Sequence, residues 1–452
     1  MHTIVEALRN GFNKGKMQSI EARRKNLLKL KHVLSEAEDE IYEALYSDLG
    51  KSEFESFETE FGLLMMEISE AVKHCASWSR CKRVGTPLML MPSSSMIQPE
   101  PLGVVLVMSP WNYPLQLTIA PLIASMAAGN CTLIKPSSYS VKVSALLKKI
   151  INENFDAEVV HVVEGGREVN EAILKERFDH IFFTGSVNVG KVIMRAAAET
   201  LTPVTLELGG KSPCIVAADA DLKMSAKRII WGKAMNCGQT CVAPDTLFVH
   251  ESVKEKLIVA MKEVIEEFYP EGCLKSPIYG KIVNEKHFQR LCSYLKEGNI
   301  LVGGKVDQAA HKIELTFIDG LNETDQCLTE EIFGPILPIL TFKEIKEVFD
   351  YVKAHEKPLA AYLFTNDHQL QKQFREELSF GGGCINTTLL HLSNSKLGFG
   401  GVGQSGMGQY HGYHGFCELS HFKSILKKSR FELPVQYPPY KDKIKVMKFF
   451  MK

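Results

Sequence analysis

Cys241 is the side chain in this sequence best suited to covalent chemistry. It follows the turn-forming stretch Gly-Gln-Thr and precedes Val-Ala-Pro, between a helical segment and the strand-like stretch TLFVH. A thiol on such a turn can be reached by a substrate, and nearby backbone N–H groups can stabilise a thiolate or an oxyanion. The competing interpretation is a buried small hydrophobic residue. Cys237 completes only a CxxxC pair, without a second CxxC or HxxxH nearby, so we expect no metal.

Glu207 and Asn112 are candidate partners of this thiol, because each follows an apolar strand-like stretch. Glu207 stands in PVTLELGGKSP, and a carboxylate held in a partly apolar pocket can act as a base near neutral pH. Asn112 stands in SPWNYP, and its amide N–H can donate to a developing oxyanion. Alternatively, Glu207 is a solvated charge at a strand end and Asn112 caps a turn.

The stretch GSVNVGK at 185–191 has the features of a phosphate-binding loop but matches neither common motif. Val187 occupies the middle glycine of G-x-G-x-x-G, and Val192 replaces the hydroxyl that a magnesium-binding phosphate loop needs. This replacement argues against an NTPase. The strand-like IFF, the turn TGS and the helix expected next still predict a helix N-terminus that tolerates phosphate.

The elements that must position these residues alternate between two periodicities. Leu27, Leu30, Leu34, Ile41 and Leu45 predict N-terminal helices, with Ser19 as a cap. From about residue 103, short β-rich stretches alternate with helical ones, and a second such series follows residue 213. We therefore predict an α/β fold with two doubly wound, mostly parallel sheets.

Composition restricts the class of function. The 452 residues carry 53 Lys plus Arg and 53 Asp plus Glu, which gives no reason to expect a nucleic-acid surface. Eleven scattered cysteines are typical of a reducing compartment rather than a disulfide framework. We find no signal peptide and no apolar stretch approaching the ~20 residues of a membrane span, and we expect a soluble, cytoplasmic protein.

Together these motifs resemble the aldehyde dehydrogenase superfamily over nearly the whole chain. The residues that carry the resemblance follow the family's order: Asn112, Lys135 in IKPS, Gly185 in FFTGS, Glu207, Cys241 in GQTCVAPD, Glu331 and Phe333 in EEIFGP, and GFGGVGQSGMGQYHG at 398–412. NCGQTCVAPD and YHGYHGF look most like the class 3, fatty-aldehyde branch.

The resemblance implies NAD(P)-dependent oxidation of aldehydes to carboxylic acids. Cys241 is then the nucleophile, Asn112 stabilises the oxyanion, and Glu207 activates the water that hydrolyses the thioester. This order is chemically reasonable, because covalent addition turns a poor hydride donor into a good one. Alternatives inside the family are an acyl-transferring member and a catalytically silent relative. A cysteine hydrolase is a poorer alternative, because no histidine stands in a papain-like setting.

The resemblance also implies cofactor and substrate residues. Lys135 is expected at the adenosine ribose, Glu331 at the nicotinamide ribose and Phe333 beside the nicotinamide. The residues expected along the pyrophosphate path are Gly185, Ser186, Val187 and Gly190. Many relatives carry glutamate where this chain has Ser138, which removes a reason to reject NADP. We therefore expect both cofactors to be used, with NAD as the default.

Tyr113 and Leu115 are expected to line an apolar substrate pocket for medium- to long-chain aliphatic or aromatic aldehydes.

The resemblance implies a Rossmann-like cofactor domain, a catalytic domain and a small β bridging arm that pairs subunits in a homodimer. The expected bounds are 1–78 and 99–207 for the NAD(P)-binding domain, 208–392 for the catalytic domain, 79–98 and 393–427 for the arm, and 428–452 for a C-terminal tail. This tail is basic and amphipathic, so it either packs against a subunit or contacts a membrane surface weakly.

Overall fold

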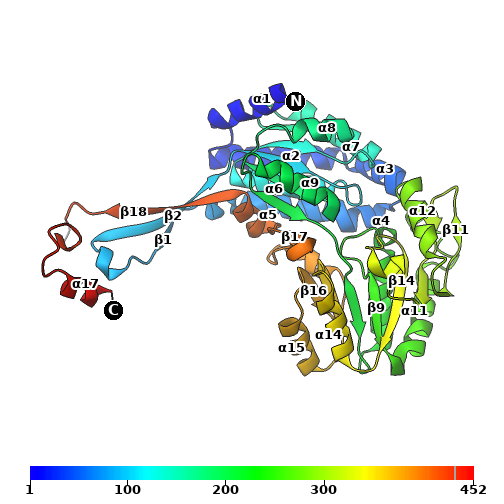
Figure 1. The fold of residues 1–452 in the computed structure, drawn as a ribbon. Helices are drawn as coiled ribbons and strands as arrows, with labels where there is room; N and C mark the ends of the chain where they lie inside the picture. Colours follow the sequence, from blue (N-terminus) through cyan, green and yellow to red (C-terminus); the bar gives the residue numbers. More distant parts are fainter. Residues whose placement is uncertain (432–433, 452) are drawn as a thin grey trace.

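Two sheets of mostly parallel strands, each covered by helices, and one antiparallel arm make up the fold (Figure 1). The computed structural model describes residues 1–431 and 434–451, and residues 432, 433 and 452 of the expected tail lie outside these ranges. The α/β class with mostly parallel sheets is therefore confirmed.

Helix α1 contacts strands β3 and β4 of the first sheet, whereas the leucine-rich helix α2 packs against α5 and α6. Leu27, Leu30 and Leu34 are fully buried, as their spacing predicts. Ser19 caps α2, because its hydroxyl accepts a hydrogen bond from the backbone N–H of Ala22 at 3.1 Å. The elements of this region are α1 (His2–Asn13), α2 (Ile20–Glu36), α3 (Glu38–Leu49), α4 (Glu53–Ser56), the π-helix η1 (Phe57–Phe61) and α5 (Gly62–Trp78).

The first sheet has six strands in the order β17-β7-β6-β3-β4-β5, and only β17 runs antiparallel to its neighbour. Strand β3 is fully buried, as expected for the middle of a parallel sheet. The strands are β3 (Val104–Met108), β4 (Cys131–Lys135), β5 (Val160–Val162), β6 (His180–Thr184), β7 (Val204–Glu207) and β17 (Gly406–Met407). The helices between them are α6 (Gln116–Ala128), α7 (Val141–Asn154), α8 (Arg167–Ile173) and α9 (Val187–Ala198).

The second sheet has seven strands in the order β10-β13-β14-β9-β8-β15-β16, and only β10 is antiparallel. Its strands are β8 (Pro213–Val216), β9 (Thr246–His250), β10 (Asn299–Val302), β13 (Thr316–Asp319), β14 (Ile336–Phe342), β15 (Ala360–Phe364) and β16 (Gly382–Ile385). Its helices are α10 (Leu222–Ala234), α11 (Lys254–Phe268), α12 (Glu285–Tyr294), α13 (Gln326–Thr329), α14 (Ile345–Ala354) and α15 (His368–Glu377). A small hairpin joins β11 (Val306–Asp307) to β12 (Lys312–Ile313).

The two sheets meet end to end. The chain passes from β7, which ends at Glu207, to β8, which begins at Pro213, through only residues 208–212. The carboxyl ends of the first sheet therefore face the amino ends of the second. Asn112 follows β3, whereas Cys241 precedes β9 and Glu331 precedes β14. This junction is where the fold can bring the motif residues together.

The arm consists of β1 (Lys82–Val84), β2 (Ser93–Pro101) and β18 (Ser420–Lys428), in which β18 pairs with β2 along nine residues (Figure 1). Helix α16 (Gly412–Glu418) leads into β18, and the tail helix α17 (Ile444–Phe450) lies against the 3-10 turn η2 (Leu88–Leu90) of the same arm. Across the described ranges, no helix combines the length and the apolar character that crossing a membrane requires.

Asn130 fixes both roots of the arm to the first sheet. Its carbonyl oxygen accepts from the backbone N–H of Gly103 at 2.9 Å, and its amide donates to the carbonyl of Leu419 at 2.9 Å. We predict that Asn130→Ala lowers the free energy of unfolding by about 1–3 kcal/mol, because it leaves two buried backbone groups without partners. Urea denaturation measures the change. Asn154→Ala on the exposed end of α7 serves as the control, and equal losses in both variants would contradict the explanation.

Candidate active site

Cys241 lies between two separate cavities at the junction of the sheets. The first, which we call the Trp231 cavity, has a volume of about 110 Å³. The second, the Glu331 cavity, has a volume of about 210 Å³. Both are lined by Cys241 and Leu117. The sulfur is therefore accessible from two directions, and the surrounding burial raises the pKa of the Cys241 thiol far above its ordinary value.

The turn before Cys241 has an unusual backbone that fixes where the sulfur lies. Asn236, Cys237 and Gly238 have φ angles of 50°, 51° and 69°, which belong to the left-handed region. A Cβ atom on Gly238 would stand 2.2 Å from the carbonyl oxygen of Gly334, so only glycine fits there. Gln239 ties the turn to a neighbouring segment by donating to the carbonyl of Lys281 at 3.0 Å.

Asn112 is almost fully buried beside this turn, as the motif predicts for a residue that follows β3. Its Nδ2 atom donates to the carbonyl of Gln239 at 3.0 Å. The backbone carbonyl oxygen of Asn112 accepts hydrogen bonds from the side chains of Asn236 at 2.7 Å and Lys51 at 3.2 Å. The amide has two hydrogens, and one remains for an oxygen atom near Cys241.

Glu207 lies at the end of β7 in the Glu331 cavity, which it shares with Cys241. The side chain is 1% exposed, and neither carboxylate oxygen has a hydrogen-bond partner. Burial, with a smaller contribution from the charge of Glu418, raises the pKa of Glu207 well above 4.5. Strand β17 pairs with β7 at this point. Gly406, the residue paired with Glu207, has a φ of 146°, a value that favours glycine.

The Glu331 cavity also contains most of the expected nicotinamide-side residues. Burial raises the pKa of Glu331 to about 8, and its Oε1 atom has no hydrogen-bond partner. A Cβ atom on Gly209 would lie 2.2 Å from this carboxylate, so the glycine keeps the space open. Phe333 packs edge-to-face on Trp111 with ring centroids 5.3 Å apart. The unpartnered hydroxyl of Thr184 lies in the same cavity.

These orphaned polar atoms fit the ribose and phosphate groups of a dinucleotide. Gly185 and Ser186 line the same cavity, and the hydroxyl of Ser186 caps α9 at 3.5 Å from the Val189 N–H. The predicted strand, turn and helix N-terminus are therefore present. Val187 lies in a neighbouring pocket, and Gly190 packs against Leu208 instead of lining the Glu331 cavity.

Two expected cofactor residues lie outside the cavities around Cys241: Lys135 ends β4, and Ser138 stands in the segment that follows this strand. Lys135 is buried, its Nζ atom donates to the carbonyl of Pro136 at 2.7 Å, and burial lowers the pKa of its ammonium to about 8. Ser138 is exposed. Neither residue lines the two cavities that contain the sulfur.

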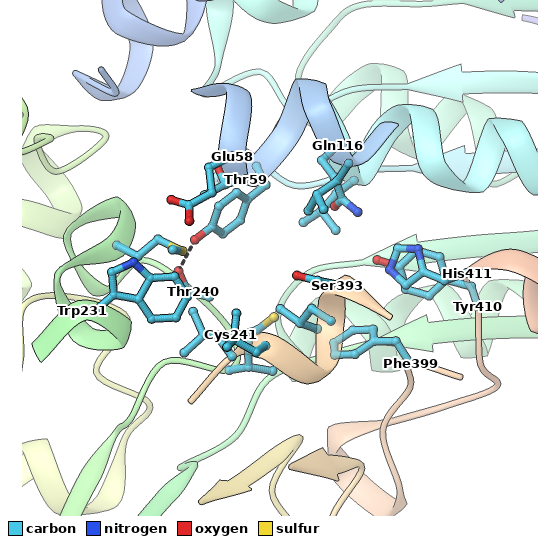
Figure 2. A pocket seen from close by; sticks show the side chains of 18 residues that line it. Glu58, Thr59, Gln116, Trp231, Thr240, Cys241, Ser393, Phe399, Tyr410 and His411 are labelled. Atoms are coloured by element: carbon cyan, nitrogen blue, oxygen red, sulfur yellow. Dashed lines mark hydrogen bonds between the residues drawn. The ribbon is translucent and has the colours of Figure 1, made fainter. Parts of the chain in front are cut away.

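The Trp231 cavity is mostly apolar (Figure 2). Figure 2 shows Trp231 and Thr240 on one side of it and Tyr410 and His411 on the other. Tyr113 lines it as expected, and its hydroxyl is 2.6 Å from that of Thr240. Leu115, by contrast, is fully buried and absent from the lining, because it turns into the core at the start of α6.

The Trp231 cavity adjoins a larger surface pocket of about 850 Å³, which we call the Phe57 pocket. Its rim includes the exposed side chains of Phe54, Phe57 and Met66. The two spaces share six lining residues: Glu58, Leu63, Gln116, Leu392, Ser393 and His411. The cavity that contains the sulfur is therefore adjacent to a pocket that opens at the surface.

Several lining residues were not predicted from the sequence. In the Glu331 cavity these include Trp111, His287 and Arg290, and Arg290 positions the segment around Phe333 by donating to the carbonyl of Ile332 at 2.7 Å. In the Trp231 cavity they include Trp231, Phe399, Tyr410 and His411. The YHG motif could have suggested the last two. In the described part of the chain, no group of three or more metal-ligating side chains could hold a metal ion.

Comparisons with known proteins show the family of the chain. A family model described as the aldehyde dehydrogenase family matches residues 1–425. The 4,4'-diaponeurosporen-aldehyde dehydrogenase of Staphylococcus aureus is 48% identical over 444 residues, which cover 98% of this chain and 97% of that protein. The aldehyde dehydrogenase family 3 member A2 of Pongo abelii is 41% identical over 455 residues, covering 100% and 94%.

Solved structures agree as well. The substrate-bound state of Staphylococcus aureus AldH has a TM-score of 0.98 and 46% sequence identity, and the match covers 100% of this chain and 99% of that one. An NAD-dependent aldehyde dehydrogenase from Sinorhizobium meliloti has a TM-score of 0.82 and 26% identity, covering 95% and 87%. The chain therefore belongs to the aldehyde dehydrogenase family, whose members are NAD(P)-dependent enzymes that oxidise aldehydes.

Proposed function

We propose that this enzyme oxidises medium- to long-chain aliphatic or aromatic aldehydes to carboxylic acids, with Cys241 as the nucleophile. The observation that carries the proposal is the position of the sulfur between an apolar cavity and a polar-lined one. An aldehyde can reach Cys241 through the Trp231 cavity while a dinucleotide occupies the Glu331 cavity.

In this proposal, each step has a residue of the chain that performs it. The Cys241 thiol releases its proton to water, the thiolate forms a C–S bond with the carbonyl carbon, and the free N–H of Asn112 donates to the resulting alkoxide. A nicotinamide held beside Glu331 and Phe333 would supply the acceptor for the hydride, and loss of that hydride converts the adduct into a thioester. Glu207 then takes a proton from water, the hydroxide attacks the thioester, and the C–S bond breaks to release the acid.

The unpartnered carboxylate of Glu207 favours hydrolysis over acyl transfer to another acceptor. An acyl-transferring enzyme needs no buried base beside its thioester, and a catalytically silent relative needs neither Glu207 nor Cys241. Both side chains are present in one cavity, which supports net oxidation to the acid.

For the cofactor, we propose that Glu331, Phe333 and Gly185 contact the nicotinamide half and that Lys135 contacts the adenosine ribose. Ser186 and Val187, at the start of α9, suit the pyrophosphate because a helix N-terminus favours anions. Gly190 supports them indirectly by its close packing on Leu208. Because Ser138 carries no charge, we propose that both NAD and NADP are used, with NAD as the default.

The apolar lining of the Trp231 cavity and the Phe57 pocket supports a long or bulky apolar aldehyde. One relative, the Staphylococcus aureus enzyme, is named for 4,4'-diaponeurosporen-aldehyde. We further propose a homodimer paired through the arm, because β18 forms an outer edge of its sheet.

A cytoplasmic location fits the eleven free thiols. Packing of α17 on the arm favours subunit contact over membrane contact for the tail.

Cys241→Ala is predicted to reduce aldehyde oxidation by roughly 10⁴-fold or more, because no other thiol lines the Trp231 cavity. The rate is followed through the absorbance of the reduced cofactor. Binding of NAD, measured by calorimetry, should stay within about twofold of the wild-type value, since the Glu331 cavity keeps its polar groups. Cys81→Ala in the arm is the control, and an active Cys241→Ala enzyme would refute the nucleophile assignment.

Glu207→Gln is predicted to form one equivalent of reduced cofactor rapidly and then turn over roughly 10²–10⁴-fold more slowly, because deacylation lacks its base. In the wild-type enzyme, the raised pKa of Glu207 predicts that kcat falls as pH decreases through a value well above 4.5, since protonation removes the base. The residual rate of the variant should lack this acid limb. A variant that lost the burst but still hydrolysed a premade thioester would contradict the role.

Ser138→Glu is predicted to lower kcat/KM for NADP by roughly tenfold or more, because the new carboxylate repels the 2′-phosphate. The value for NAD should change little. Ser138→Gln has nearly the same size without the charge and separates repulsion from steric effects. A wild-type enzyme that already rejects NADP by more than about a thousandfold would contradict dual cofactor use.

A further inference from the structure

A buried ion pair lies under the loop that carries Asn112, and no step of the proposed chemistry uses it. Lys51 and Glu60 are each 0% exposed, and their Nζ and Oε1 atoms are 2.5 Å apart. Burying two charges is costly unless further hydrogen bonds satisfy them. The partners of this pair therefore indicate what it holds.

All of these partners belong to the segment that begins at Asn112. Lys51 donates to the carbonyl oxygen of Asn112 at 3.2 Å, and its ammonium lies 3.9 Å from the centre of the Tyr113 ring. The second oxygen of Glu60 accepts from the backbone N–H groups of Leu115 at 2.9 Å and Gln116 at 3.1 Å. The carboxylate thereby caps the first turn of α6, where a negative charge is favourable.

The pair thus holds the Asn112 segment at both ends, and the π-helix η1 makes this possible. Glu60 lies in η1 between α4 and α5, where the widened helical turn carries its side chain into the interior. Such π turns are frequent at functional sites.

The same N-terminal region also contacts the nucleophile turn. Glu55 accepts from the backbone N–H of Asn236 at 2.6 Å, and Asn236 in turn donates to the carbonyl of Asn112 at 2.7 Å. The carbonyl of Asn112 is therefore the point where the Lys51 ammonium and the left-handed turn before Cys241 meet.

We propose that Lys51 and Glu60 are positioning residues for aldehyde oxidation: through the backbone of residues 112–116 they orient the Asn112 amide toward the oxygen of the Cys241 adduct. The inference rests on the proposed role of Asn112. A displacement of one ångström or so is enough to weaken such a donor strongly, so the pair affects the rate of adduct formation and hydride release more than substrate binding.

A double variant separates positioning from mere stability. Lys51→Met combined with Glu60→Gln removes both charges at nearly constant volume, and neutral replacements of buried ion pairs are often tolerated. We expect it to fold and to bind NAD normally, while the single-turnover rate of cofactor reduction falls roughly 10- to 100-fold with KM for the aldehyde changed less than about threefold. The single variant Lys51→Met, which keeps Glu60, should unfold at a lower temperature than the double variant, because its buried carboxylate lacks a partner.

The decisive measurement repeats the double variant in an Asn112→Ala background. If the pair acts through Asn112, its removal there should cost less than about threefold, because coupled residues are not additive. Arg9→Met with Asp179→Asn removes another ion pair, at the far side of the first sheet, and should leave the rate unchanged.

Two results would overturn the inference. One is a folded double variant that reduces the cofactor at the wild-type single-turnover rate. The other is a double variant whose rate falls by the same factor in the wild-type and in the Asn112→Ala background. A wild-type rate for Asn112→Ala by itself would instead refute the oxyanion role, and the positioning role with it, so the two failures can be told apart.

Discussion

Burial of the reactive side chains at the junction of the two sheets is the constraint on which the site depends. Burial raises the pKa values of Cys241, Glu207 and Glu331, so each group is harder to ionise than in water. The same low polarity strengthens any hydrogen bond to a developing charge. Ionisation of these groups therefore costs more here than in water, and donors fixed nearby can stabilise the charge that develops during the reaction.

The end-to-end arrangement of the sheets explains how one small volume acquires such different groups. Carboxyl ends of parallel strands supply Asn112 and Glu207, whereas loops entering the second sheet supply Cys241 and Glu331. Residues 208–212 connect the sheets directly, so Glu207 at the end of β7 and the beginning of β8 in the second sheet are held close to each other by the chain itself. The N-terminal helices add the third component, because Lys51 and Glu60 lock the loop between β3 and α6.

How much could be predicted from the sequence depended on whether a residue had a local signal. Cys241, Glu207 and Asn112 each follow a distinct turn or strand, and the structure brings all three to one junction. Lys51 and Glu60 had no such signal, because their contacts lie in a segment more than fifty residues further along the chain and depend on a π-helix.

Residues on helices were the hardest to assign. Trp231 on α10 has the sequence environment of an ordinary core residue, and only the tertiary packing turns it into the wall of a cavity. Leu115 was expected in the substrate pocket, but the lining passes to Gln116 and Leu117, since successive residues at a helix start point in different directions. The alternation of strands and helices, by contrast, was enough to predict both sheets.

The two cavities around the sulfur have a consequence for how this enzyme could diversify. Among the residues that the structure describes, they share only Leu117 and Cys241, although the segment 110–117 contributes to both walls. A substitution such as one at Trp231 can reshape the acceptance of organic chains without touching the nucleotide wall. The range of aldehydes accepted and the preference for one cofactor can therefore change independently during evolution, while the nucleophile stays in place.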